Sequence, residues 1–271
     1  MGTYFLTLFL SHLLADFVFQ DDAMAEKKQS ENITERTHTL LVHASHFLGT
    51  SIVLFFLIRG IEWWPSFALK GLPWSVIIGL VILSVSHFVV DFLKVIIQKK
   101  VNGQHPVIVF LADQLVHLGL ILGFMVYFQN SQLWNSLKLQ ISYLNSGVNL
   151  SLKPTHSQNI LLLLCVVILT TSFANVFIKI SLSSIKIKVA SDEEEIKIGR
   201  LIGGVERTLT IMAVVAGSYE ALAALYAAKA AIRFNDTKTK PGFAEYFILG
   251  TTISALIGIL IGLFVKRYLE F

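Results

Sequence analysis

The sequence predicts an all-α, polytopic membrane protein, a helical bundle with about eight transmembrane spans. Hydrophobic residues make up 54% of the 271 residues and charged residues only 15%, and the mean hydropathy of +0.67 exceeds what a soluble domain of this length needs. Apolar runs long enough to cross a bilayer, roughly 20 residues, recur along the chain. Because Cys165 is the single cysteine, an intramolecular disulfide and a cysteine-rich metal site are excluded.

Four apolar runs come first and form the predicted four-helix block at residues 1–130. They span residues 3–20, 40–59, 74–98 and 107–128. An extramembrane loop is predicted at 131–158, where "LKLQISYLNSGVNLSLK" alternates apolar and polar residues around an Asn-Ser-Gly turn signal. This alternation predicts a small hairpin or a pair of surface strands.

The second half of the chain begins with a fifth predicted transmembrane helix at 159–182. A charged cytoplasmic loop is predicted at 183–200, where "IKIKVASDEEEIKI" also has some strand character. The C-terminal block, 201–271, is predicted to contain three more helices. As a single helix, residues 201–234 would be about 50 Å long, too long for a hydrocarbon core, so we expect this stretch to break near Gly217.

Positive charge predicts the orientation of the chain. The loops after the first, third, fifth and seventh helices carry most of the Lys and Arg residues of the connections. These loops are therefore predicted to face the cytoplasm, and both termini are predicted to lie outside. The same loops explain the formal net charge of +4, so we expect membrane lipid as a partner and no nucleic acid.

Ionisable residues interrupt each of the four helices of the first block. The pairs are His12 and Asp16, His43 and His46, His87 and Asp91, and Asp113 and His117. Spacings of four or three residues place both members of each pair on one face of a helix. Because burying such groups in a bilayer is costly, each is a candidate functional residue.

The depth of these residues in the membrane is the stronger signal. Consecutive helices run in opposite directions, so residues placed at random would fall in both leaflets. Counted from the side of the first and third loops, all the pairs lie roughly 6 to 16 Å from the same edge. The reversed order on the third and fourth helices places His87 level with His117 and Asp91 level with Asp113. Helical bundles build His and carboxylate metal sites from facing pairs of this kind.

The sequence therefore predicts an intramembrane metal centre in one layer of the bundle. Imidazole and carboxylate groups suit a divalent transition metal, with zinc first and iron or manganese as alternatives, as one ion or as two about 4 Å apart. All eight residues of the pairs are predicted ligands, and the predicted catalytic residues are Asp16, Asp91 and Asp113. The structural alternative is that the pairs are polar contacts between helices, each contributing about 0.6 to 2 kcal/mol.

Four segments of the first block, "HLLADFVFQ", "LLVHASHF", "HFVVDFLK" and "ADQLVHL", resemble successive motifs of DUF3307, a bacterial family of unknown function. The later "GRLIGGVERTLT", "AAKAAIRF" and "AEYFILGT" resemble its C-terminal part. The resemblance implies a bacterial inner-membrane protein and adds Gln20 and Gln114 as candidate substrate-binding residues. His46 lies outside the motifs and ranks below the other ligands. The pattern is similar to that of bacterial membrane-bound metal-dependent hydrolases, whose helices also carry His and Asp.

A second group of charged residues lies in the C-terminal helices, near the same edge as the His and Asp layer. It comprises Glu206, Arg207, Lys229, Arg233 and Glu245. If Glu206 pairs with one cation, another cation is free to bind an anion such as the phosphate of a lipid head group. Lys94, one turn beyond Asp91, is a further candidate contact to the substrate. The alternative is that these cations anchor helices at the membrane boundary.

The leading hypothesis is an integral-membrane metal-dependent hydrolase that acts on an amphipathic, lipid-linked phosphate substrate. The metal would activate water, an aspartate that does not bind the metal would accept its proton, and the basic residues would orient the substrate. One alternative is a transporter whose layer binds a divalent ion or relays protons. Another is a b-type cytochrome with His pairs as axial haem ligands, although aspartates four residues from each His have no ligand role there.

Overall fold

The computed structural model describes residues 2–67, 74–101, 104–128, 156–185, 193–239 and 241–269. Within these ranges the chain forms helices and no strand, which confirms the predicted all-α fold. The hairpin predicted around the Asn-Ser-Gly turn lies outside the described residues. The chain divides into two compact units, Met1–Cys165 and Val166–Phe271.

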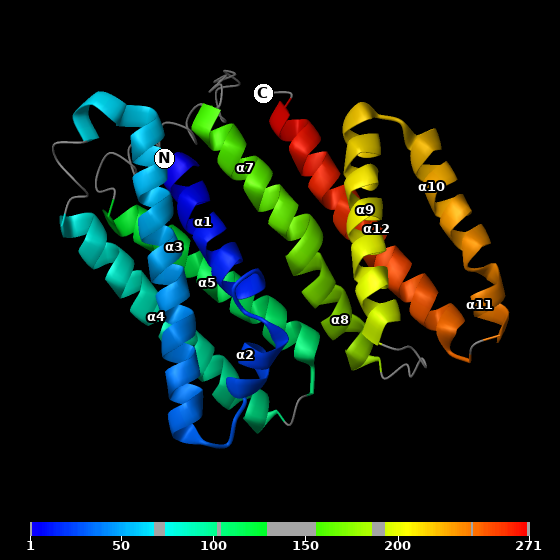
Figure 1. The fold of residues 1–271 in the computed structure, drawn as a ribbon, viewed down its shortest axis with the longest axis horizontal. Helices are drawn as coiled ribbons and strands as arrows, with labels where there is room; N and C mark the ends of the chain where they lie inside the picture. Colours follow the sequence, from blue (N-terminus) through cyan, green and yellow to red (C-terminus); the bar gives the residue numbers. More distant parts are fainter. Residues whose placement is uncertain are drawn as a thin grey trace, which may run out of the picture. The chain divides into compact units, whose positions relative to one another are not determined.

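Four helices of the first unit pack in a closed ring, in which α1 and α4 each contact both α3 and α5. The bounds of these helices are α1 (Gly2–Phe17), α3 (Ile33–Phe67), α4 (Trp74–Lys100) and α5 (Pro106–Phe128). A short helix, α2 (Asp22–Lys27), lies between α1 and α3 (Figure 1), and the side chain of Asp21 caps it by accepting the N–H of Met24 at 2.7 Å. The unit ends in the first part of α7 (His156–Ile168).

The side chains of the first unit are distributed between interior and surface as in a membrane protein. Apolar residues fill part of the interior, where Leu8, Phe47 and Leu80 are almost fully buried, but polar residues such as Thr7 and Ser11 are equally buried. Many large apolar side chains instead lie on the outside of the helices. Water disfavours such a surface, whereas lipid accommodates it.

The second unit contains the remaining helices of the described chain. They are η1 (Leu169–Phe173), a π-helical turn, followed by α8 (Ala174–Ser184), α9 (Glu193–Ala216), α10 (Tyr219–Ile232), α11 (Phe234–Thr239) and α12 (Phe243–Leu269). The predicted break is confirmed, because α9 ends just before Gly217, whose φ of 71° is readily adopted by glycine. The helix begins earlier than expected, so Glu193–Arg200 are helical rather than a loop with strand character. The spacing of Glu193 and Lys197 favours a helix there.

Five described helical segments are long and apolar enough to cross a membrane, so the chain has the character of a membrane protein. They are Ile33–Ile58, Val76–Lys100, Pro106–Val126, His156–Ser184 and Phe243–Tyr268. The predicted count of about eight is not confirmed. With 16 residues α1 is short for a span, α10 has 14, and α9 carries several charged residues along its length.

Two glycines allow α9 and α12 to pack closely in the second unit. A Cβ atom at Gly262 would lie 2.9 Å from Cβ of Val214 and 3.3 Å from Cα of Ile211. A Cβ atom at Gly258, one turn earlier on α12, would lie 3.0 Å from a methyl group of Thr210. Glycines four residues apart on one helix face are a common means of close helix contact in membranes.

We expect Gly262→Ala to lower the melting temperature of the detergent-solubilised protein, because the new methyl group would push α12 away from the backbone of α9. Overpacking of this kind costs on the order of 1–3 kcal/mol. Gly123→Ala is the matched control, since a Cβ atom at Gly123 meets nothing within 4 Å. Equal melting temperatures for the two variants would contradict the close packing of α9 and α12.

Candidate metal centre

The four helices of the ring in the first unit bring their His and Asp residues together. α1 carries His12 and Asp16, α3 carries His43, α4 carries His87 and Asp91, and α5 carries Asp113 and His117. The exposed fractions of these residues are between 1% and 9%. The structure therefore places every predicted ligand except His46 in one buried cluster, which we call the His/Asp cluster.

Asp16 lies at the centre of the His/Asp cluster. Its Oδ1 atom is 3.2 Å from Nε2 of His43 and 3.4 Å from Nε2 of His87. The two Nε2 atoms are 3.0 Å apart, and Nδ1 of His12 lies 3.7 Å from the same oxygen. Side chains from α1, α3 and α4 thus converge on one small volume.

Three imidazole rings pack beside this point. The ring centroids of His87 and His117 are 4.3 Å apart, and those of His12 and His117 are 4.8 Å apart. A cavity of about 10 Å³ lies among these rings and apolar side chains that include Phe47, whose ring stacks on His87. A space of this size holds about one water molecule.

Two lysines neutralise part of the negative charge of the cluster. Nζ of Lys94 donates to Oδ2 of Asp113 at 2.7 Å. Nζ of Lys28, which follows α2, donates to Oδ2 of Asp91 at 2.7 Å and also to the side-chain oxygen of Gln20. The position of Lys28 explains how Gln20 enters the site, since Gln20 helps to hold the ammonium group against Asp91.

Gln114 links the two sides of the cluster. Its side-chain oxygen lies 3.1 Å from Nε2 of His12, and its nitrogen donates to Oδ2 of Asp16 at 3.3 Å and to Oδ2 of Asp113 at 3.1 Å. An amide can donate and accept at the same time, so Gln114 fixes the orientation of three predicted ligands.

Three overlapping groups within the cluster could hold a metal ion. In each group the ligand atoms lie within 4.8 Å of one another, and the groups are His12, His87 and His117; Asp16, His43 and His87; and Asp16, Asp113 and His117. Asp91 belongs to none of these groups, although its Oδ2 lies 3.3 Å from Nε2 of His43. His46 lies apart and packs its ring against Phe19.

Several buried polar atoms of the cluster lack a hydrogen-bond partner. These atoms include Oδ1 of Asp16, Oδ1 of Asp113 and Nε2 of His117. Nδ1 of His117 lies 2.9 Å from the backbone oxygen of Asp113. Because a carbonyl oxygen only accepts, Nδ1 carries the hydrogen and Nε2 keeps a free lone pair. A backbone carbonyl orients many metal-binding histidines in this way.

The charged group of the second unit is arranged differently from the predicted anion site. Nζ of Lys229 donates to Oε2 of Glu206, which agrees with the expectation that Glu206 pairs with one cation. Arg233 pairs instead with Asp236 on α11 at 3.0 Å, and Glu245 is exposed. Lys229 and Arg233 are therefore each paired with a carboxylate.

Arg207 is the most deeply buried charged residue of this group, with 1% of its surface exposed. Its Nε donates to the backbone oxygen of Thr170 at 2.6 Å, Nη1 to Oγ of Ser254 at 3.0 Å and Nη2 to Oδ1 of Asn175 at 2.7 Å. The guanidinium group thus joins η1, α8 and α12. Thr170 lies in the π-helical turn, where the regular pattern of backbone hydrogen bonds is interrupted.

Sequence reasoning missed Lys28 as well as the partners of Arg207. Lys28 lies in a polar segment beside Lys27, where a lysine is typical of a cytoplasmic loop. Thr170, Asn175 and Ser254 are uncharged, so a search for charged residues in apolar helices does not find them. Their positions inside apolar stretches are the only sequence signal.

Comparison with known proteins gives one match. The family model described as "Protein of unknown function (DUF3307)" matches residues 4–145, slightly more than half of the chain. This range contains the whole His/Asp cluster. The match ends before α7, so the resemblance of the C-terminal segments remains a prediction. No curated protein and no solved structure matches the sequence.

We expect Arg207→Lys to lower the melting temperature in detergent. A single ammonium group cannot reach acceptors on three elements, and each buried acceptor left without a donor costs about 1–3 kcal/mol. Arg200→Lys is the matched control, because Arg200 is exposed on the same helix. If both variants melted at the wild-type temperature, Arg207 would not be the structural link between these helices.

Proposed function

The chain belongs to the DUF3307 family, and we propose that it is an integral-membrane metal-dependent hydrolase with its metal in the His/Asp cluster. The triangle formed by Oδ1 of Asp16 and the Nε2 atoms of His43 and His87, with sides of 3.0 to 3.4 Å, carries the proposal. Ligand atoms about 2.0–2.1 Å from a tetrahedral zinc ion are separated by roughly 3.3–3.4 Å. The sides of the triangle are therefore close to the ligand separation of a tetrahedral zinc site.

The unpartnered atoms of the cluster support metal binding over polar contacts between helices. Polar contacts are useful inside a membrane when donors and acceptors are matched. Here Oδ1 of Asp113 and Nε2 of His117 are buried without a hydrogen-bond partner, and so is Oδ1 of Asp16, which has only the Nε2 atoms of His43 and His87 at 3.2 and 3.4 Å. A divalent cation would compensate these atoms and the excess negative charge at once.

The aspartates have different proposed roles. Asp16 belongs to two of the ligand groups and Asp113 to one, so both are proposed ligands. Asp91 lies outside these groups but beside His43, and it is the proposed general base. When bound, the ion would make water a stronger nucleophile near neutral pH. Asp91 would accept the proton of this water, and Lys28 would hold the carboxylate in position.

The proposed substrate is an amphipathic molecule, such as a lipid-linked phosphate, that reaches the cluster from the membrane. The proposed location is the bacterial inner membrane, with both termini outside. The cavity of about 10 Å³ beside His12 and His117 is far smaller than a porphyrin, which disfavours the b-type haem alternative. A transporter would need the same ligands, so transport and hydrolysis are separated by experiment below.

Metal analysis of the purified full chain tests the metal centre. We expect about one divalent ion per chain in the wild type, with zinc as the first candidate. An Asp16→Ala, His87→Ala double variant should lose the ion, since it removes two of the three ligands of the triangle. His46→Ala is the control and should retain the ion, because His46 lies apart from the cluster. A metal-free wild type, or equal metal content in all variants, would overturn the proposal.

Hydrolysis of a chromogenic phosphate monoester tests the reaction. We expect Asp91→Asn to keep the metal and to lower kcat by roughly 10²-fold or more, as is typical for loss of a general base. Asp22→Asn, on the exposed side of α2, should leave kcat unchanged. If the metal-loaded protein hydrolyses no phosphate ester but conducts a divalent ion across liposomes, the hydrolase proposal is wrong and transport replaces it.

A further inference from the structure

Four buried ligand atoms on α1 and α5 have no hydrogen-bond partner. They are Nδ1 of His12, Oδ1 of Asp16, Oδ1 of Asp113 and Nε2 of His117, and the residues that carry them are between 2% and 9% exposed. The triangle that carries the proposed function uses one of these atoms, Oδ1 of Asp16. The other three are left uncompensated by an ion in that triangle, and burying polar atoms without a partner is costly.

Gln114 determines which nitrogen of His12 carries the hydrogen. The side-chain nitrogen of Gln114 lies 3.3 Å from Oδ2 of Asp16 and 3.1 Å from Oδ2 of Asp113, and an ionised carboxylate can only accept. The amide oxygen therefore points to Nε2 of His12, 3.1 Å away, and this nitrogen donates to it. Nδ1 of His12 keeps a free lone pair, as Nε2 of His117 does.

These four residues lie close enough together to share one ion, and we call them the second ligand set. Asp16, Asp113 and His117 form one of the groups whose ligand atoms lie within 4.8 Å of one another. His12 adds a fourth ligand, because its Nδ1 is 3.7 Å from Oδ1 of Asp16 and its ring stacks on that of His117. Two carboxylates and two imidazoles suit a divalent transition metal.

Asp16 belongs both to the second ligand set and to the triangle. Its Oδ1 is 3.2 Å from Nε2 of His43 and 3.4 Å from Nε2 of His87, which complete the triangle. The same oxygen is 3.7 Å from Nδ1 of His12 in the second ligand set. One carboxylate is thus placed to contact two ions, and the ions of two-metal sites are roughly 3.5–4 Å apart.

Lys94 contacts the second ligand set through the other oxygen of Asp113. Its Nζ donates to Oδ2 at 2.7 Å, which places a positive charge beside the set. The side chain of Lys94 is 24% exposed, whereas that of Lys28 on Asp91 is 9% exposed. A lysine near an edge can extend its flexible stem and move its ammonium group into water. Of the two lysines that contact the cluster, Lys94 is therefore the more easily displaced.

The charge of the cluster predicts that a second ion binds more weakly than the first. Three aspartates and two lysines give the cluster one net negative charge when its histidines are neutral. One divalent ion reverses this to one net positive charge, so the first ion and Lys94 both repel a second ion. Displacement of Lys94 into water removes one of these charges from the site, and an anionic substrate would offset another.

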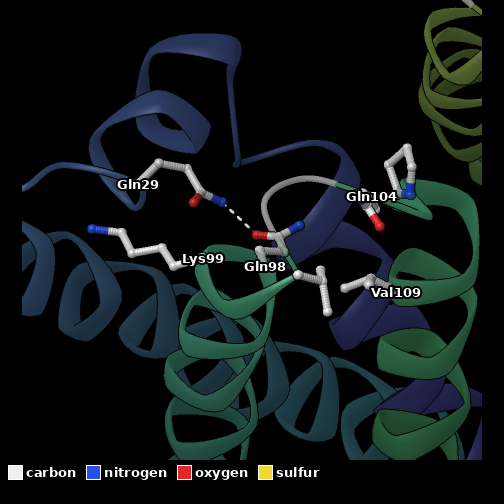
Figure 2. Close-up of a pocket in the computed structure, with 7 residues that line it drawn as sticks. Gln29, Gln98, Lys99, Gln104 and Val109 are labelled. Atoms are coloured by element: carbon white, nitrogen blue, oxygen red, sulfur yellow. Dashed lines mark hydrogen bonds between the residues drawn. The ribbon is translucent and has the colours of Figure 1, made fainter.

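The pocket at the ends of α2 and α4 offers no comparable set of ligands (Figure 2). Its volume is about 360 Å³, and none of the seven described residues that line it is His, Cys, Asp or Glu. Gln29 donates to the side-chain oxygen of Gln98. Lys99 extends away from the other labelled residues in Figure 2 and pairs with Glu31. In the described part of the first unit, we therefore expect a second ion in the cluster rather than in this larger space.

We propose that the His/Asp cluster is a two-metal centre, in which a second divalent ion binds the second ligand set and displaces the ammonium group of Lys94 from Asp113. Asp16 bridges the two ions. This inference rests on the proposed function, because the first ion occupies the triangle. Two ions at this separation can stabilise both the attacking and the leaving oxygen of a hydrolytic reaction. Lys94 occupies Asp113 whenever the second ion is absent and so competes with it.

Titration of the full chain with cobalt(II) in detergent, after a chelator has removed bound metal, tests the inference. Cobalt(II) can replace zinc at His and carboxylate ligands and is paramagnetic. We expect two ions per chain, and we expect spin coupling to change the electron paramagnetic resonance spectrum as the second ion binds. His117→Ala should lose the second ion and the coupling but keep the first ion. His46→Ala is the control and should bind both ions, because His46 lies apart from the cluster.

Removal of the competing cation provides a test with the opposite sign. We expect Lys94→Gln to strengthen binding of the second ion by roughly tenfold or more, because the ion no longer has to break a charge-assisted hydrogen bond. Misfolding would weaken binding and cannot produce this result. Lys100→Gln is the matched control for net charge, since Lys100 is exposed at the end of the same helix, and it should leave the affinity unchanged.

The possible results separate this inference from the proposed function. One cobalt ion per chain at saturation, two ions without spin coupling, or two coupled ions in His117→Ala overturns the second site. Equal affinity for the second ion in Lys94→Gln and Lys100→Gln overturns the competition by Lys94. In all these cases the first ion is still bound and the proposed function stands. A chain that binds no divalent ion, zinc included, overturns both.

Discussion

The carboxylate of Asp16 is the contact on which the arrangement of the first unit depends. One of its oxygens lies within 3.7 Å of His12, His43 and His87, and the other accepts from Gln114, so it joins α1 to α3, α4 and α5. A charge at this depth has no water to solvate it. The ring of helices is closed around the residues that compensate it, and the polar cluster and the helix packing therefore form one structural unit.

The connection between α1 and α3 is explained by the same constraint. Asp91 also needs a cation, and on the described helices of the ring its neighbour is the imidazole of His43 at 3.3 Å. The chain supplies Lys28 by forming the short helix α2 directly after α1, with Asp21 as its cap and Gln20 as a second acceptor for the ammonium group. What looks in the sequence like a polar loop is therefore part of the buried site.

The main features of the first unit follow from the sequence because helix period and helix direction are simple constraints. Four-residue spacing places His87 and Asp91 on one face, and alternating direction brings them level with His117 and Asp113. The partners of the aspartates do not follow in the same way. Lys28 reaches Asp91 from a separate segment, and no periodicity relates the two residues. The predicted start of α9 was also wrong, because a short charged segment can alternate apolar and polar residues like a strand and still be helical.

Comparison of the two polar centres separates a structural role from a binding role. In the second unit, each nitrogen of the Arg207 guanidinium group donates to a neutral acceptor, so the charge is dispersed over hydrogen bonds that the protein itself completes. In the first unit, one oxygen each of Asp16 and Asp113 and Nε2 of His117 are buried without a hydrogen-bond partner, while the second oxygens accept from Gln114 and Lys94. Burying polar groups is costly in both centres, but only in the first do the ligand atoms of several His and Asp residues lie within 4.8 Å of one another. A bound cation would compensate these atoms, and this favours the His/Asp cluster over Arg207 as the proposed functional centre.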